Sequence, residues 1–115
     1  FGVLSIYNMR NRFLRIILFF DLPVETASQR KAYAFFRKKL ITNGFIMLQK
    51  SVYTKLVINR QSMELEINKV KTILPKEGLV QILTVTEKQF SRIETILGTA
   101  IVHSEISSTS RLVII

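Results

Sequence analysis

The residue with the clearest potential for chemistry is Asp21, the single aspartate of the chain. It follows the apolar run Phe13–Phe20 and stands two residues before Pro23, which offers no N–H to a sheet. One interpretation is a turn residue that caps nearby backbone N–H groups. The other is a metal ligand, because hard cations such as Mg²⁺, with Mn²⁺ as the alternative, prefer carboxylate and water oxygens. A cation held there could activate water for phosphodiester cleavage, which would make Asp21 a catalytic residue.

Other chemistry is restricted by composition. The chain has no cysteine, which excludes disulfides, zinc–thiolate sites, iron–sulfur clusters and thiol nucleophiles. Its one histidine, His103, is best interpreted as a structural or surface residue, and no Ser/His/Asp set can be assembled around it. The four glycines are isolated, so a glycine-rich phosphate loop is absent from the sequence.

A basic segment follows Asp21. Thr26 and Gln29 predict a capping box, and Gly44 predicts the end of the helix that they begin. The apolar residues of this helix form one stripe, and five cations lie opposite or beside it: Arg30, Lys31, Arg37, Lys38 and Lys39. Phe35 falls outside the stripe and needs another partner. Because residues 26–43 contain no acid, we interpret the cations as a surface for nucleic-acid phosphates, with an ordinary solvated face as the alternative.

Length and charge agree with a single basic domain. The chain has 115 residues, 48% of them hydrophobic, with a net charge of +9 and a pI near 10.3. Such a charge usually serves a polyanion, most often nucleic acid, although solubility alone or an anionic membrane surface are alternatives. The longest apolar run is too short to span a membrane and no cleavable signal is apparent, so we expect a cytoplasmic protein without a membrane partner. Without a base-reading motif, we expect sequence-independent contact with the nucleic-acid backbone.

The elements that would carry these residues alternate in a simple order. Residues 1–12 are expected to be an N-terminal arm or an expression remnant, and residues 13–115 a single domain. The predicted strands are Phe13–Phe20, one kinked or two short strands within Phe45–Ile58 with a bend at Lys50–Ser51, and Leu79–Val85. The predicted helices are Ala27–Asn43, one that begins at Asn59 or Ser62 and ends at Pro75, and a short one from the Thr86/Gln89 capping box to about Leu97. Late strands are expected at Ile101–Glu105 and Leu112–Ile115. The order is β-α-β-β-α-β, which predicts an α+β, ferredoxin-like sandwich with both long helices on one face of an antiparallel sheet.

This arrangement leaves one sheet face without helices, yet that face is apolar. It would carry Ile17 and Phe19 from the first strand and Leu83 and Val85 from the last long one. We therefore expect two copies to form a homodimer through this face, with those four residues at the interface. A twofold axis would then bring two Asp21 side chains together, so the dimer could build a metal site that one chain cannot. The strands within residues 99–115 could extend a partner's sheet.

Several segments resemble one known family. FLRIILFFDLP (Phe13–Pro23), followed by a basic helix, resembles the start of the smaller of the two universal CRISPR adaptation proteins, a family of CRISPR-associated endonucleases with a ferredoxin-like fold. GFIMLQKSVYTKLVI (Gly44–Ile58), LTVTEKQF (Leu83–Phe90) and RLVII (Arg111–Ile115) resemble its later segments, most closely those of the type II-A subgroup.

The resemblance implies a role and a partner. Members form homodimers through their sheet faces, and in spacer acquisition the dimer bridges two integrase dimers and supports a duplex of foreign DNA before its insertion into the CRISPR array. The aspartate assigned to Mg²⁺ in cleaving members matches Asp21. The C-terminal strands of members contact the partner subunit or the integrase, which matches Ile101–Ile115.

Three hypotheses follow. The first is a dimeric bridge that holds duplex DNA, and the second is a Mg²⁺-dependent endonuclease that cleaves RNA or double-stranded DNA. The third, a ferredoxin-like regulatory domain for a small ligand, leaves the charge of +9 unexplained. We favour the first as the physiological role.

Overall fold

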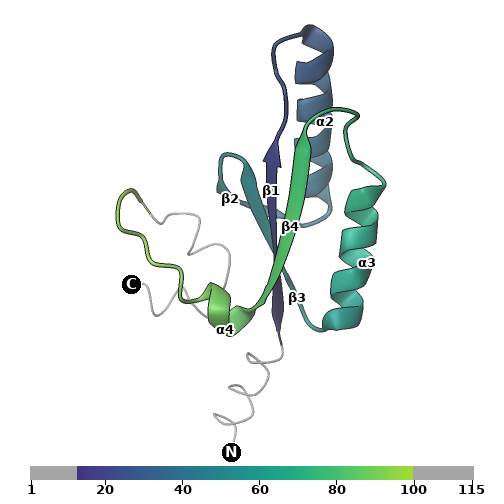
Figure 1. The fold of residues 1–115 in the computed structure, drawn as a ribbon. Coiled ribbons are helices and arrows are strands. Elements are labelled where there is room, and N and C mark those ends of the chain that lie inside the picture. The colour runs from purple at the N-terminus through teal and green to yellow at the C-terminus, as the bar shows by residue number, and fades with distance from the viewer. Residues whose placement is uncertain (1–12, 100–115) are drawn as a thin grey trace, which may run out of the picture.

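The structure, a computed structural model, describes residues 13–99 of the chain. The arm at 1–12, His103 and the predicted late strands lie outside the described residues. In chain order the elements are β1 (Leu14–Asp21), α2 (Ala27–Thr42), β2 (Ile46–Gln49), β3 (Val52–Val57), α3 (Arg60–Lys71), β4 (Leu79–Thr86) and α4 (Glu87–Phe90) (Figure 1). None of the helices between residues 13 and 99 has the length and apolar character that crossing a bilayer requires.

The four strands form one antiparallel sheet in the order β2-β3-β1-β4. This order, with α2 and α3 on the same side of the sheet in Figure 1, is the ferredoxin-like arrangement that the element order predicted. A turn at Lys50–Ser51 separates β2 from β3, so the two-strand alternative is correct. β1 is central because it pairs with both β3 and β4, and every residue of β1 has a partner in β4.

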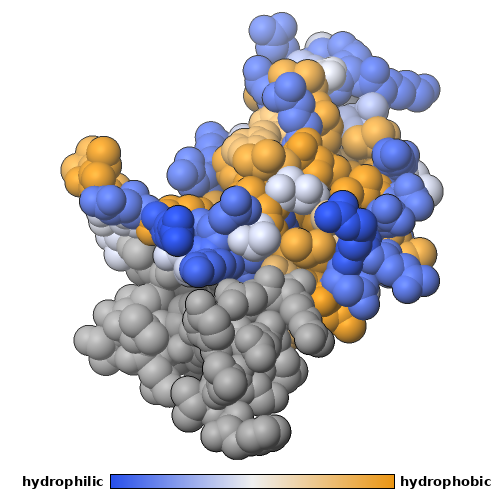
Figure 2. Space-filling model, turned by 60° about the horizontal axis from the view of Figure 1, so that its bottom comes forward, coloured by the Kyte–Doolittle hydropathy of each residue, from blue (hydrophilic) through white to orange (hydrophobic). Residues whose placement is uncertain are grey.

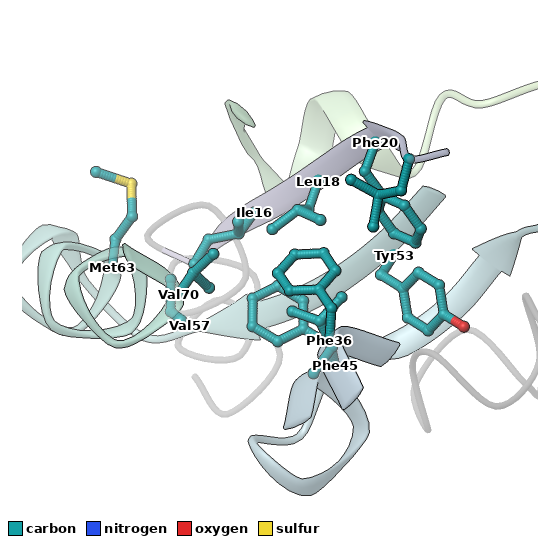
Figure 3. Close-up of a cluster of buried hydrophobic side chains, with 11 residues drawn as sticks. Ile16, Leu18, Phe20, Phe36, Phe45, Tyr53, Val57, Met63 and Val70 are labelled. Atoms are coloured by element: carbon teal, nitrogen blue, oxygen red, sulfur yellow. The ribbon is translucent and has the colours of Figure 1, made fainter. Parts of the chain in front are cut away.

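The main core lies between the sheet and the two long helices. The alternating residues Ile16, Leu18 and Phe20 of β1 are buried there, as their spacing predicted. Phe36 of α2 packs edge-on against Phe20, with ring centroids 5.4 Å apart. Figure 3 labels these side chains together with five others of the cluster, which are Phe45, Tyr53, Val57, Met63 and Val70.

The ends of the helices follow local sequence signals. Both predicted capping boxes are present: Thr26 accepts from the Gln29 N–H at 3.1 Å, and Thr86 accepts from the Gln89 N–H at 3.0 Å. Asn59 is the N-cap of α3, so of the two predicted starting points Asn59 is correct and Ser62 is not. That helix ends at Lys71 with Thr72 as its C-cap, so it stops four residues short of Pro75, where the sequence predicted its end.

The prediction of a helix from Thr86 to about Leu97 was wrong, because α4 ends at Phe90. A short helix depends on packing an apolar face for its stability. Beyond Phe90 the apolar residues Ile93, Ile96 and Leu97 are exposed, so a longer helix would have little surface against which to pack.

A small ion network fastens α3 to the sheet. The Lys55 ammonium on β3 donates to the Glu66 carboxylate of α3 at 2.8 Å and to the Asn43 carbonyl at the end of α2. Lys69 donates to the other oxygen of Glu66 at 3.2 Å. Partial burial raises the pKa of Glu66, but the hydrogen bonds and charges of the two lysines outweigh it, so the pKa lies below its ordinary value.

Candidate nucleic-acid interface and metal ligand

Asp21 is the last residue of β1 and its side chain is exposed. It pairs with Leu79 at the start of β4, on the sheet face that α2 and α3 do not cover. Phe19, Ser51 and Gln81 join it around a shallow hollow of about 270 Å³. The carboxylate therefore lies where solvent, a cation or a second chain can reach it.

The position of Asp21 depends on two backbone contacts. The Phe20 N–H donates to the Ser51 carbonyl at 3.0 Å, which holds the end of β1 against the β2–β3 turn. Gly78, with a φ of +107°, packs closely against the backbone of Asp21 and Leu22. A Cβ at Gly78 would lie 2.8 Å from the Asp21 carbonyl oxygen and 2.7 Å from the Leu22 side chain, so this close approach requires glycine.

The residues at this hollow fit a hard cation only in part. Within residues 13–99 no three His, Cys, Asp or Glu side chains come close enough to hold a metal ion together. Mg²⁺ commonly takes one or two carboxylates and fills its other positions with water and substrate phosphate. Asp21 can supply one carboxylate, with the Ser51 hydroxyl and the Gln81 amide as neutral oxygens at the same hollow. Among the residues that line the hollow, Asp21 is the one carboxylate.

All five predicted phosphate-binding cations are exposed on α2. They are Arg30, Lys31, Arg37, Lys38 and Lys39. Arg30 and Arg37 are seven residues apart, as are Lys31 and Lys38, so each pair forms a row along one side of the helix. At 1.5 Å per residue, the two members of a row are separated by about 10.5 Å along the helix axis.

Arg30 has a structural role that the sequence did not reveal. Its Nη1 donates to the Val24 carbonyl at 3.1 Å and to the Glu25 carbonyl at 2.9 Å, which holds the loop between β1 and α2. Its charge stays at the surface, but part of its donor capacity is used within the chain. The four other cations of this set, Lys31, Arg37, Lys38 and Lys39, are therefore the better candidates for phosphate contacts.

The apolar sheet face is only partly covered within the chain. Phe19, Leu79 and Leu83 are 38%, 55% and 51% exposed. Ile17, by contrast, is 8% exposed and packs with Phe90 and Val85 in a second small core. Ile17 and Val85 thus have partners in their own chain, and Phe19 and Leu83 are the predicted interface residues that remain free for a second copy. Figure 2 shows hydrophobic surface in the middle of the view with hydrophilic side chains above it and to either side.

A buried ion pair beneath α4 escaped the sequence analysis. Arg15 of β1 donates from Nε to Glu87 Oε1 at 2.8 Å and from Nη2 to Glu87 Oε2, and its guanidinium carbon lies 4.3 Å from the centroid of the Phe90 ring. The signal was present as an arginine within an apolar strand, on the face with Ile17. Its partner is 72 residues away, so nothing local identified Glu87.

With this geometry established, comparison with known proteins identifies the family. The family model described as CRISPR associated protein Cas2 matches residues 14–93, from the start of β1 to just beyond α4. The chain belongs to this Cas2 family. The resemblance inferred from the sequence motifs is thereby confirmed.

Curated relatives agree with this assignment. A protein of Treponema denticola is 52% identical over 85 residues, which cover 74% of this chain and 84% of the relative. One of Streptococcus mutans is 48% identical over 103 residues, covering 87% of this chain and 91% of the relative. One of Campylobacter jejuni is 36% identical over 104 residues, covering 90% and 73%. Each of these relatives is named a CRISPR-associated endoribonuclease Cas2.

Proposed function

We propose that this Cas2-family chain acts as a homodimer in CRISPR spacer acquisition. The dimer bridges two dimers of the integrase and supports a duplex of foreign DNA before its insertion into the CRISPR array. The observation that carries the proposal is the separation of two surfaces. The exposed apolar residues Phe19 and Leu83 lie on one side of the sheet, and the basic helix α2 packs on the other.

This separation makes the two roles compatible. Pairing through the apolar face removes Phe19, Leu79 and Leu83 from water and leaves α2 of each copy exposed. The dimer then carries two acid-free basic helices, one on each outer side. Because phosphate contacts do not depend on base identity, such a surface binds duplexes of any sequence, as foreign DNA requires.

The dimer is tested by sedimentation. We expect wild type to sediment as a dimer at micromolar concentration, and Leu83→Asp to shift it toward a particle of 13.3 kDa. Leu65→Asp is the matched control, because Leu65 is a similarly exposed residue on the other layer of the fold, in α3. A wild-type chain that remains a monomer contradicts the proposal.

Duplex binding is tested through its dependence on salt. We expect the triple variant Lys31→Glu, Arg37→Glu, Lys38→Glu to bind all duplex sequences more weakly. The slope of log affinity against log salt should fall by about 2 to 3 per chain, since each phosphate contact contributes about 0.9. Arg60→Glu with Lys71→Glu, on α3, is the control for a general loss of positive charge. An unchanged slope in the triple variant means that the phosphates are bound elsewhere.

The bridging role is tested by co-purification with the integrase, with and without a short DNA duplex. We expect the Leu83→Asp variant to lose the assembled complex while Leu65→Asp retains it. Assembly of a complex by a monomeric variant contradicts the bridge.

A second function, Mg²⁺-dependent endonuclease activity on RNA or double-stranded DNA, is favoured by the exposed carboxylate of Asp21 at its hollow. The curated relatives are named endoribonucleases, which supports the same chemistry. Two Asp21 carboxylates, one from each copy, would hold the ion, and Mn²⁺ is the alternative metal. When bound, such an ion supplies an activated water and stabilises charge on a phosphate.

We expect Asp21→Asn to abolish metal-dependent cleavage and to leave both dimer formation and duplex binding intact. Glu25→Gln is the control, because it removes an exposed acid four residues away. If cleavage survives in Asp21→Asn, the metal is held by other residues.

A further inference from the structure

Phe35 occupies an unusual position on α2. Its neighbour Phe36 is fully buried in the core, while Phe35 is 53% exposed and absent from both hydrophobic clusters. A single exposed aromatic residue is common on protein surfaces and carries no meaning alone. The residues around Phe35 distinguish it from such an isolated aromatic residue.

Lysines flank Phe35 along the helix. Lys31 stands four residues before it, Lys38 three after it and Lys39 four after it, so all three lie one turn away on the same part of the surface. The Lys39 ammonium lies over the ring, 5.5 Å from its centroid. No acidic residue occurs on α2, so these charges have no compensating partner on their own helix. An apolar ring within a positive field favours a ligand that combines negative charge with a flat apolar surface.

We propose that Phe35, with Lys31, Lys38 and Lys39, forms a binding site for an unpaired nucleotide of a single-stranded nucleic acid. The ring stacks on the base, and the lysines contact the flanking phosphates. Bases inside a duplex already stack on one another, so only a single strand, an overhang or a frayed end presents a free face to Phe35. This inference rests on the proposed binding of nucleic acid and adds a preference for unpaired segments.

The shape of α2 beside Phe35 suits a continuing strand. Ser28 and Ala32 share the side of the helix that carries Phe35, at spacings of seven and three residues. Both line a hollow of about 280 Å³ between α2 and the chain after α3, where Tyr33 and Lys76 also lie. Toward the start of the helix, a strand that stacks on Phe35 therefore meets a concave surface with a further aromatic ring and a further cation, Lys76, whose neighbour Glu77 lines the same hollow.

Affinity measurements test the site against the proposed function. We expect Phe35→Ala to weaken binding of a single-stranded oligonucleotide by about tenfold, within the range measured for loss of one stacked base. Phe35→Leu, which keeps an apolar side chain, should weaken it nearly as much, and both should bind a blunt duplex of the same sequence like wild type. If wild type binds neither oligonucleotide, the proposed function fails. If wild type binds both and the two variants bind the single strand normally, the stacking site alone is overturned.

A fluorescence measurement tests stacking directly. The chain has no tryptophan, so Phe35→Trp introduces a single reporter. We expect its emission to be quenched by a single-stranded oligonucleotide and much less by a blunt duplex. Leu65→Trp is the matched control, because Leu65 is 58% exposed on α3 and its basic neighbour Lys69 is paired with Glu66. Equal quenching at both positions, or none at position 35, overturns the proposal.

Discussion

The Arg15–Glu87 pair offers the sharpest test of how α4 is held on the sheet. Both groups are almost completely buried, with side-chain exposures of 1% and 8%. The guanidinium makes a two-pronged contact with the carboxylate, and Phe90 covers it. Glu87 also donates its own N–H to the Phe13 carbonyl at 2.9 Å, so one residue joins α4 to the beginning of β1 twice.

Removing one partner leaves the other charge buried without compensation. Breaking a buried ion pair in this way costs about 3–5 kcal/mol of stability. If the arginine beneath Phe90 also loses its order, the lost cation–π attraction costs about 1–2 kcal/mol more. We expect Glu87→Gln to cost about 3 kcal/mol, because the neutral amide still accepts one hydrogen bond. Since a small domain has only about 5–15 kcal/mol of stability, this is a large fraction of the total.

The assay is equilibrium urea unfolding followed by circular dichroism, at several protein concentrations so that dimer dissociation is separated from unfolding. The set is Glu87→Gln, Arg15→Met and the double variant. We expect each single change to destabilise strongly and the double variant to cost much less than their sum, because it leaves no buried charge. Single variants that each cost less than about 1 kcal/mol, or costs that simply add, would refute the reasoning.

Two other predictions follow from contacts in the structure. Gly78→Ala is expected to destabilise the fold by about 2–3 kcal/mol, because the added Cβ meets both the Asp21 carbonyl and Leu22 at a positive φ. Gly98 is the control, since it has nearly the same φ but open space around it, and Gly98→Ala should cost about 1 kcal/mol in the same unfolding assay. Equal costs for the two variants contradict the close approach at Gly78. Glu66→Gln is expected to cost about 1 kcal/mol at pH 7. Because the folded pKa of Glu66 is depressed, its contribution is present above the unfolded pKa and is lost as pH falls through the folded one, so the difference between wild type and Glu66→Gln should shrink below about pH 4.5 in unfolding curves. A difference that stays constant down to pH 2 contradicts the network.

Most of the secondary structure was open to prediction because its signals are local. The strand before Pro23, the two capping boxes and the Asn59 cap all depend on residues within a few positions of one another. The sheet order then followed from the element order, since a β-α-β-β-α-β chain has few compact arrangements. The position of Asp21 at a strand end also followed, because Pro23 limits β1.

Contacts between distant parts of the chain could not be predicted in the same way. Tyr53 is an example, because its buried hydroxyl has no hydrogen-bond partner among the described residues, and Figure 3 shows it pointing away from the other labelled side chains. An alternating strand pattern gives the face of a side chain but not the atoms around its tip.

By itself the amino-acid sequence determined the class of the fold, the basic helix, the lone strand-end carboxylate and the family, because composition, spacing and short motifs encode them. Tertiary structure alone decided which part of the apolar sheet face stays open. Ile17 is covered and Phe19 is not because α4 is anchored by a glutamate 72 residues from its arginine. Such an anchor depends on where β1 and β4 meet in space, and no spacing along the chain records that meeting.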